Sequence, residues 1–439
     1  MLITHAYAGF AILAILAFVL FDPRRAAVAL YFGGWLLLPV GHYPPGTMTT
    51  SYFTVNVIGA GLPANLGLTK AAVIPPVILL VWLLVRVRRI VAPALAPLDY
   101  AIAAFCAWPL AGALIRGSDL LAAAEDVAYL GACWGGTWAL ARLLLRDQDG
   151  RIAVLRGAAW SAVALLPVAA VEGFRKPWLY EAIWGNHPFL LEGAARTVGY
   201  RPLGFFEHGN QYALWLAAGC LAWLALLGLD RLGRGGAVFT AATAVATVAS
   251  QSIGAMLLLA AGAAALWTSR LWLMRSVLAG GVATMLVGAV YLSGVVPVER
   301  LRHSAALAPQ NVARFSAVRL KSLLYRVRRD QMAIPILRRA PVAGMGHWDW
   351  WRPIGSHPWG LPLLLAGQFG AVAVLLLLVG LLVPAVSALF RGDRAQVACA
   401  ILVLMAAADA LLNSFIYFPA VLLASALVSV GRPMRQMPA

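Results

Sequence analysis

Long apolar runs recur along this sequence and constrain its fold more than any other feature. Each run extends over about 15 to 25 residues, and short connections that carry arginine separate the runs. A hydrocarbon core about 30 Å thick is crossed by about 20 apolar residues of α-helix, so these runs predict transmembrane helices. Hydrophobic side chains make up 62% of the chain and charged ones 12%, which excludes an ordinary soluble domain. The sequence therefore predicts an all-α integral membrane protein, a polytopic helical bundle.

The runs predict about 12 to 13 transmembrane helices. The expected spans are 6–21, 26–40, 70–85, 97–115, 120–143, 152–171, 210–229, 236–249, 252–268, 275–295, 360–386, 395–412 and 415–430. They divide the chain into an N-terminal transmembrane bundle (1–295), a large loop (296–359) and C-terminal transmembrane helices (360–439). The first run has no basic residue before it and no small-residue cleavage site after it, so we expect no cleavable signal.

Arginines of the short connections indicate how the chain is oriented. They fall on alternate connections, at Arg24, Arg25, Arg86, Arg88, Arg89, Arg142, Arg146, Arg151, Arg156, Arg231, Arg234, Arg270, Arg275, Arg391, Arg394, Arg432 and Arg435. The opposite short connections carry almost no basic residue besides Arg116. Because cytoplasmic loops concentrate positive charge, we expect the first set and the C-terminus in the cytoplasm. The segments 172–209 and 296–359 are then extracytoplasmic.

The large loop 296–359 is strongly basic. It holds eleven basic residues against three acidic ones, a net charge of +8. An anionic partner at the outer membrane surface would explain this charge, and a solvated basic loop without a ligand is the alternative. Within the loop, Leu320, Leu323, Leu324 and Val327 follow the i, i+3, i+4, i+7 spacing, with basic residues around them. This pattern predicts an amphipathic helix at the membrane interface, or an ordinary surface helix.

The end of the loop is rich in aromatic and histidine side chains. Trp348, Trp350, Trp351 and Trp359 lie close in sequence to His347 and His357. Tryptophans at this level either anchor a protein in the membrane interface or stack on sugar rings. The neighbouring histidines and arginines favour glycan contact, with Trp350 and Trp359 as candidates.

A second polar segment on the same expected face reads YRPLGFFEHGN (200–210). It places Arg201, Glu207, His208 and Asn210 at the outer edge of a predicted span, where polar residues are costly and often functional. Arginine binds phosphate bidentately, and histidine can take a proton from a hydroxyl. The chain has no Walker, dinucleotide-binding, HExxH or GxSxG pattern. A transferase on that face would need a donor activated beforehand, such as a sugar on a polyprenyl diphosphate.

The cysteines indicate neither a metal centre nor a disulfide framework. Cys106, Cys133, Cys220 and Cys399 all lie inside apolar runs, whereas such sites need clustered or loop cysteines. We expect no metal and no cofactor.

Three patches together resemble the O-antigen ligase and polymerase-like membrane proteins. Arg201 with GFFEHGN (204–210) resembles the family's arginine followed by Gly-x-Phe-x-x-Pro-Asn. The stretch RVRRDQMAIPILRRAPVAGMG (326–346) resembles its arginine-to-Pro-x-x-Gly-x-Gly element. SHPWGLPLLLAGQFG (356–370) resembles its His-Asn run into a helix. The sequence departs from the family at Gly209, Gln251 and Pro358, where proline, arginine and asparagine are usual.

The resemblance implies metal-independent, inverting transfer of a glycan from undecaprenyl diphosphate to an acceptor hydroxyl. The protein would lie in a bacterial cytoplasmic (inner) membrane with a periplasmic active face. His357 would be the base and Arg201 and Arg326 the diphosphate ligands. His208 and Asn210 would shape the pocket. The remaining substrate-binding candidates are the loop arginines Arg328, Arg329 and Arg338. Expected partners are the lipid-linked donor, the acceptor and the bilayer, with no nucleic acid.

Two questions stay open in the sequence. The acceptor could be lipid A-core, a growing glycan or a protein hydroxyl, which would make the protein a ligase, a polymerase or an O-oligosaccharyltransferase. A transporter or flippase of lipid-linked glycans is the non-enzymatic alternative. Transporters more often show internal repeats and ionisable residues near the middle of a span. The sequence has no clear repeat, and Glu125, Asp126 and Asp409 are its notable charges within apolar runs.

Overall fold

The computed structural model describes residues 2–41, 69–86, 94–185, 187, 194–196, 198–231, 235–293, 310–355, 357–415 and 417–428. Throughout these residues the chain is helical, apart from connections and two isolated β-bridges (Gly41 with Thr69, Ala195 with Tyr200). Parts of the large loop (294–309 and Ser356), several expected cytoplasmic arginines (Arg88, Arg89, Arg234, Arg432 and Arg435) and the end of the expected span 415–430 lie outside the described residues.

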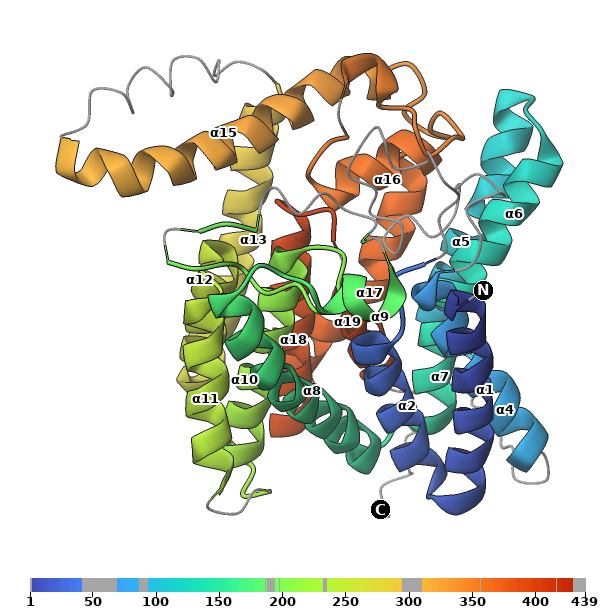
Figure 1. Cartoon of the computed structure of the whole chain (residues 1–439). Helices are drawn as coiled ribbons and strands as arrows, with labels where there is room; N and C mark the ends of the chain where they lie inside the picture. The colour runs from blue at the N-terminus through green and yellow to red at the C-terminus, as the bar shows by residue number, and fades with distance from the viewer. Residues whose placement is uncertain are drawn as a thin grey trace, which may run out of the picture.

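The helices of the N-terminal part are α1 (Leu2–Leu20), α2 (Pro23–Leu37), α4 (Lys70–Arg86), α5 (Pro97–Arg116), α6 (Leu120–Leu130), a π-helical turn (Gly131–Gly135), α7 (Gly136–Leu144), α8 (Gln148–Phe174) and α9 (Leu179–Trp184). Next come α10 (Gly209–Gly228), α11 (Gly235–Ala249), α12 (Ile253–Trp267), α13 (Arg270–Leu292) and α15 (Gln310–Leu337). A 3-10 turn (Arg352–Ile354) then precedes α16 (Leu361–Phe369), α17 (Ala371–Arg391), α18 (Arg394–Ala410) and α19 (Pro419–Ala426). Figure 1 shows their arrangement as a bundle.

Six helices among the described residues are long and apolar enough to cross a membrane: α1, α5, α8, α10, α13 and α17. The shorter helices α4, α11 and α12 are also apolar. The structure therefore agrees with the prediction of a helical membrane protein. The larger count of 12 to 13 spans stays a prediction.

Helix α10 is the centre of the bundle, because 83% of the residues in its 18-residue apolar stretch are buried inside the protein. Gly219 lets α8 approach it, since a Cβ there would lie 2.2 Å from the side chain of Ala162. The Trp223 indole of α10 donates a hydrogen bond to the Ala159 carbonyl of α8 at 2.9 Å. Trp215 of α10 lies 6.1 Å from Trp35 of α2, which in turn stacks on Phe418 at 5.2 Å. These contacts join both halves of the sequence in one core.

Two expected spans are divided in the structure. The run 360–386 is broken at Gly370, where φ is +87° and a Cβ would lie 1.9 Å from the Val342 carbonyl oxygen. Helix α16 ends there and α17 begins as a separate helix, so the expectation of one continuous span was wrong. The run 120–143 is α6, the π-helical turn and α7 in succession. A hydropathy average does not register either interruption, because both segments are apolar throughout.

The arginine-bearing connections meet at one end of the bundle. Arg24 contacts Asp147, and Arg151 forms an ion pair with Asp393 at 3.7 Å. Arg270 donates to the Leu389 carbonyl at 2.6 Å. In Figure 1 this end points down.

The alternate connections meet at the opposite end. Arg116 donates to the Ala343 carbonyl at 2.5 Å, and Arg201 donates to the Gln251 carbonyl at 3.2 Å. Helix α15 lies across this end in Figure 1, with part of its length extending beyond the bundle. The contacts therefore place the arginine-bearing connections and the connections between them at opposite ends of the bundle, as their alternation along the sequence predicted.

The apolar stripe expected in α15 is seen in part, and the side chain of Leu320 lies outside the described residues. Leu324 and Val327 are buried against the bundle, and the same face continues through Ala333 and Ile336. Leu323 is 41% exposed and does not belong to that face.

Candidate functional site

The first and second family-like patches meet at Asn413, in the connection after α18. The Asn413 amide oxygen accepts a hydrogen bond from the Arg326 guanidinium at 2.7 Å. It also accepts one from the Asn210 amide at 3.3 Å, and Asn210 accepts from Arg201 at 2.7 Å. Asp409 accepts from the Asn413 amide nitrogen at 2.8 Å, which fixes the orientation of that amide. Arg201 and Arg326, 125 residues apart by number, thus belong to one hydrogen-bonded network.

Local structure around Gly209 explains how Arg201 reaches this network. A Cβ at position 209 would lie 2.2 Å from Arg201 Cδ, so glycine allows the arginine to cross the start of α10. The guanidinium also donates to the Ser250 and Gln251 carbonyls at 3.3 and 3.2 Å. These carbonyls are at the C-terminal end of α11, where partners are needed. Arg201 is buried and links α10 to the α11–α12 connection.

The third patch joins the network through Trp359. The Arg326 guanidinium lies 4.8 Å from the centre of the Trp359 ring, a cation–π arrangement. Asp330, one turn further along α15, accepts hydrogen bonds from the backbone N–H groups of Trp359 and Gly360 at 2.7 and 3.3 Å. Burial raises the pKa of Asp330 to about 6, and those two N–H groups and Arg326 oppose the shift. Helix α15 therefore positions both an arginine and the segment that carries His357.

His357 is buried between two tryptophan rings. Its ring centre lies 5.2 Å from that of Trp359 and 5.9 Å from that of Trp351. Nδ1 lies 2.7 Å from the Pro358 carbonyl oxygen, which can only accept, so Nδ1 carries the proton in the neutral ring. Burial lowers the pKa of His357 to about 4, and the hydrogen bond to Pro358 opposes this. The ring is thus neutral near pH 7, with its lone pair on Nε2.

His208 is a second neutral histidine at this end of the bundle. It stacks on Phe415 with ring centres 4.7 Å apart, and its Nδ1 accepts from the Asn210 N–H at 3.0 Å as the N-cap of α10. Burial lowers the pKa of His208, and the charges of Arg201 and Arg326 lower it further. Both arginines therefore act on the same small region, which is electropositive.

The Pro341–Gly346 segment is a structural support. The N–H groups of Met345 and Gly346 donate to the Gly367 and Gln368 carbonyls at 2.7 and 2.9 Å. Gly344 has φ +65°, and a Cβ there would lie 2.5 Å from the Gln368 oxygen. The glycines therefore let this segment hold the end of α16.

The other substrate-binding candidates lie apart from the network. Arg328 and Arg338 are exposed on α15 and at its end. Arg329 donates to the Ile354 carbonyl at 2.7 Å and lies over the Tyr325 ring. Trp350 is 1% exposed, with its indole against Gly367 and its N–H donating to the Leu364 carbonyl at 3.2 Å. The structure thus brings together Arg201, Arg326, His208, Asn210, Trp359 and His357, and leaves these four outside.

Several residues that organise this end were missed in the sequence. Asp409 was noted only as a charge within an apolar run, and its i, i+4 spacing from Asn413 is a signal that could have found Asn413. Lys70 is buried and donates to the Trp35 and Phe205 carbonyls at 2.9 and 2.7 Å, which fixes the segment before His208. The only sign of Lys70 in the sequence was its place as a lone lysine at the start of an apolar run.

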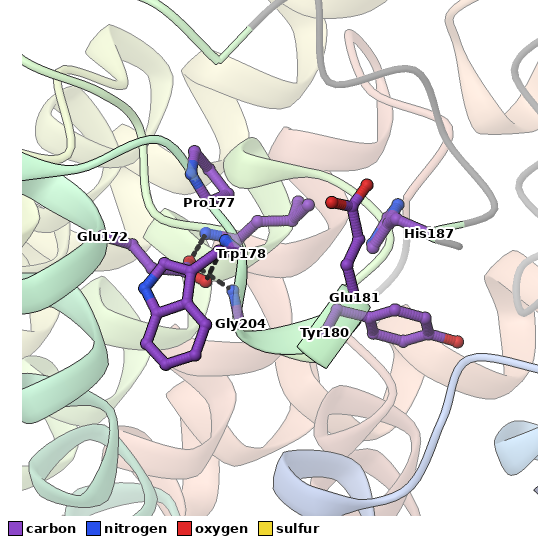
Figure 2. A pocket seen from close by; sticks show the side chains of 8 residues that line it. Glu172, Pro177, Trp178, Tyr180, Glu181, His187 and Gly204 are labelled. Atoms are coloured by element: carbon purple, nitrogen blue, oxygen red, sulfur yellow. Dashed lines mark hydrogen bonds between the residues drawn. The ribbon is translucent and has the colours of Figure 1, made fainter. Parts of the chain in front are cut away.

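Glu172 supports the same segment from the end of α8. Its carboxylate accepts from the backbone N–H groups of Trp178, Leu179, Leu203 and Gly204 at 2.8 to 3.3 Å. Figure 2 shows Glu172 between Trp178 and Gly204, with a small cavity beside it bordered by Tyr180, Glu181 and His187. A carboxylate with this many backbone donors is committed to structure.

Comparison of the chain with protein-family models, with curated proteins and with solved structures gives no match. The functional argument therefore depends on the site itself. Two arginines that share a polar network, with neutral histidines beside them, can bind a multiply charged anion and accept a proton.

Proposed function

We propose that this chain is a membrane glycosyltransferase of the O-antigen ligase/polymerase type. It would move a glycan from undecaprenyl diphosphate to an acceptor hydroxyl at the extracytoplasmic end of the bundle, without a metal ion. The cytoplasmic assignment of the arginine-rich end follows from the positive-inside rule.

The observation that carries the proposal is the convergence at Asn413. Arg201 and Arg326 come from distant stretches, yet hydrogen bonds through Asn210 and Asn413 join them. A cation–π contact between Arg326 and Trp359 adds the segment that carries His357. A bundle needs no such collection of cations for stability, because burying charged groups away from water is costly. Asp409 and Asp330 lie near Arg326 and offset part of its charge, and a bound diphosphate would add a further anionic partner for the two arginines.

The reaction assigns a separate task to each group. The acceptor oxygen bonds to the anomeric carbon of the donor sugar while the bond from that carbon to the diphosphate oxygen breaks. The electron pair leaves on the diphosphate, which Arg201 and Arg326 would stabilise as its charge grows. His357 Nε2 would take the acceptor proton. A pKa of about 4 makes the imidazolium of His357 unfavourable in the protein alone, and the charge of a bound diphosphate would raise this pKa.

Product formation by purified protein in liposomes tests this proposal. The donor would be a glycan on a polyprenyl diphosphate, with EDTA present, and lipid A-core, glycan and protein acceptors would be offered separately. We expect release of polyprenyl diphosphate with one acceptor class. His357→Ala should lower the rate by about 10²- to 10⁴-fold without loss of donor binding. Arg326→Gln should weaken donor binding as well.

Matched variants separate these roles from general damage. His347→Ala removes an exposed histidine of the same loop, and Arg339→Gln removes an exposed arginine near the end of α15. Both should keep wild-type rates. A protein that binds the donor but transfers it to no acceptor class would favour the transporter or flippase. A wild type that neither binds nor transfers such donors would refute both functions.

A further inference from the structure

An apolar groove of about 530 Å³ lies between α1 and α2. Its lining includes Gly9, Gly33, Gly34 and Leu38, with Arg25 and Trp184 at its ends. In Figure 1 these two helices lie at the edge of the bundle. Only 17% of the residues in the 18-residue apolar stretch of α1 are buried inside the protein. The groove therefore opens toward the hydrocarbon of the membrane.

Two glycines hollow the groove out. A Cβ on Gly9 or on Gly33 would meet no atom within 4 Å, so the space beside each is empty. Gly34 differs, because a Cβ there would lie 2.9 Å from the Ile74 side chain. Larger side chains at positions 9 and 33 would fill the groove without disturbing the contacts that hold α2 to α4.

The two ends of the groove are chemically different. Arg25 borders one end, among the arginine-bearing connections. Its neighbour Arg24 contacts Asp147, whereas no carboxylate of the described residues forms an ion pair with Arg25. The Asp22 carboxylate accepts from the backbone N–H of Arg25 as the cap of α2. Trp184 borders the groove at α9, close to Phe205.

The length of the groove suits a single hydrocarbon chain. Arg25 to Leu38 spans 13 helical steps, or about 20 Å at about 1.5 Å per residue. One leaflet of the hydrocarbon core is about 15 Å thick, half of about 30 Å. A chain that starts at the headgroup level near Arg25 would therefore lie along most of the apolar wall.

We propose that this groove is a binding site for one anionic phospholipid of the leaflet at the arginine-rich end. Its phosphate pairs with Arg25 and one acyl chain fills the space beside Gly9 and Gly33. The lipid supplies to α1 the packing contacts that the described residues do not provide on this side. A polyprenyl diphosphate is a poorer occupant, because the network of Arg201 and Arg326 that would bind its charge lies at the opposite end of the bundle.

Lipid binding by delipidated protein in detergent tests the site, with native mass spectrometry as the readout. Phosphatidylglycerol and phosphatidylcholine with the same acyl chains are the probes. The wild type should retain phosphatidylglycerol in preference to phosphatidylcholine. Gly33→Leu, which fills the groove, should weaken phosphatidylglycerol binding by about tenfold or more, equivalent to about 1.4 kcal/mol. Gly9→Leu is a second variant with the same expected result.

Two controls make the outcome specific. Gly280→Leu places the same side chain in open space on α13, outside the groove, and should bind lipid as the wild type does. Arg25→Gln should remove the preference for phosphatidylglycerol, whereas Arg391→Gln, an exposed arginine at the end of α17, should preserve it. Equal binding by wild type and Gly33→Leu would overturn the proposal. So would equal retention of the two lipids, or displacement of phosphatidylglycerol by equimolar undecaprenyl phosphate.

Discussion

At the scale of single residues, buried polar groups decide how the candidate site behaves. His357 donates its Nδ1 proton to the Pro358 carbonyl, and Asp330 accepts from the two N–H groups that follow. One group is a base kept neutral by burial and the other an acid whose ionisation burial disfavours. Their opposite chemistry gives opposite effects of pH on folding stability.

We expect His357 to make the folding stability decrease as the pH is lowered. Burial lowers its folded pKa to about 4, whereas the unfolded chain takes up that proton near 6.5. The unfolded state therefore binds more protons between these values, so stability is lost as pH falls from 6.5 to 4. His357→Gln should reduce the fall in unfolding free energy by about 1–3 kcal/mol, measured by denaturation at several pH values.

Asp330 should have the opposite effect of pH on folding stability and therefore serves as a control. Burial raises its folded pKa to about 6, so the folded state binds more protons between 3.8 and 6, and this residue favours folding as pH falls. Asp330→Asn, which keeps an acceptor oxygen for Trp359 and Gly360, should steepen the loss at acid pH. Identical pH profiles for wild type and both variants would contradict the assignment of these buried groups.

Lys70 gives a second prediction at this scale. Lys70→Met leaves the buried carbonyls of Trp35 and Phe205 without their donor, and each unsatisfied group costs about 1–3 kcal/mol. Thermal unfolding should show a lower midpoint for Lys70→Met than for Lys176→Met, which replaces an exposed lysine. Equal midpoints for the two variants would show that the Lys70 contacts add nothing to stability.

At the scale of helices, the apolar runs predicted most elements closely. The expected spans 97–115 and 210–229 correspond to α5 (Pro97–Arg116) and α10 (Gly209–Gly228). Hydropathy could not predict the helix break at Gly370, because the close contact there is with the Val342 carbonyl. Val342 lies outside the apolar run 360–386. Asn413 and Lys70 were missed for a similar reason. Local signals mark both residues, namely the Asp409–Asn413 spacing and a lone lysine in an apolar run. Neither signal reveals the partners Arg326 and Phe205, which are distant in sequence.

The connection between the Pro341–Gly346 segment and α16 depends on Gly344. Gly344→Ala introduces a side chain where φ is +65° and where the Gln368 oxygen would lie 2.5 Å away. The backbone conformation alone costs about 1–3 kcal/mol, and the clash adds to it. Gly355→Ala is the matched control, since φ is +71° but no atom lies within 4 Å of its Cβ. Gly344→Ala should unfold at the lower temperature and lose more transferase activity, and equal losses would contradict a supporting role for this contact.

At the scale of the whole molecule, the contacts separate two chemically different ends. One gathers the arginine-bearing connections through contacts such as Arg24 with Asp147 and Arg151 with Asp393. The other gathers α15, the segment of His357 and the network of Asn413. The groove beside Arg25 belongs to the first end and the candidate transferase site to the second. The two proposals therefore place different anions on opposite sides of one membrane.

Thiol labelling of single-cysteine variants tests this sidedness. All four native cysteines are buried, so they should react little with a membrane-impermeant maleimide. Arg338→Cys lies exposed at the end of α15, and Arg391→Cys lies exposed among the arginine-rich connections. In intact spheroplasts we expect labelling of Arg338→Cys alone, and after permeabilisation labelling of both, because the positive-inside rule predicts that Arg391 faces the cytoplasm. The reverse pattern would place His357 at the cytoplasmic face, where an extracytoplasmic donor could not reach it, and the transferase proposal would fail.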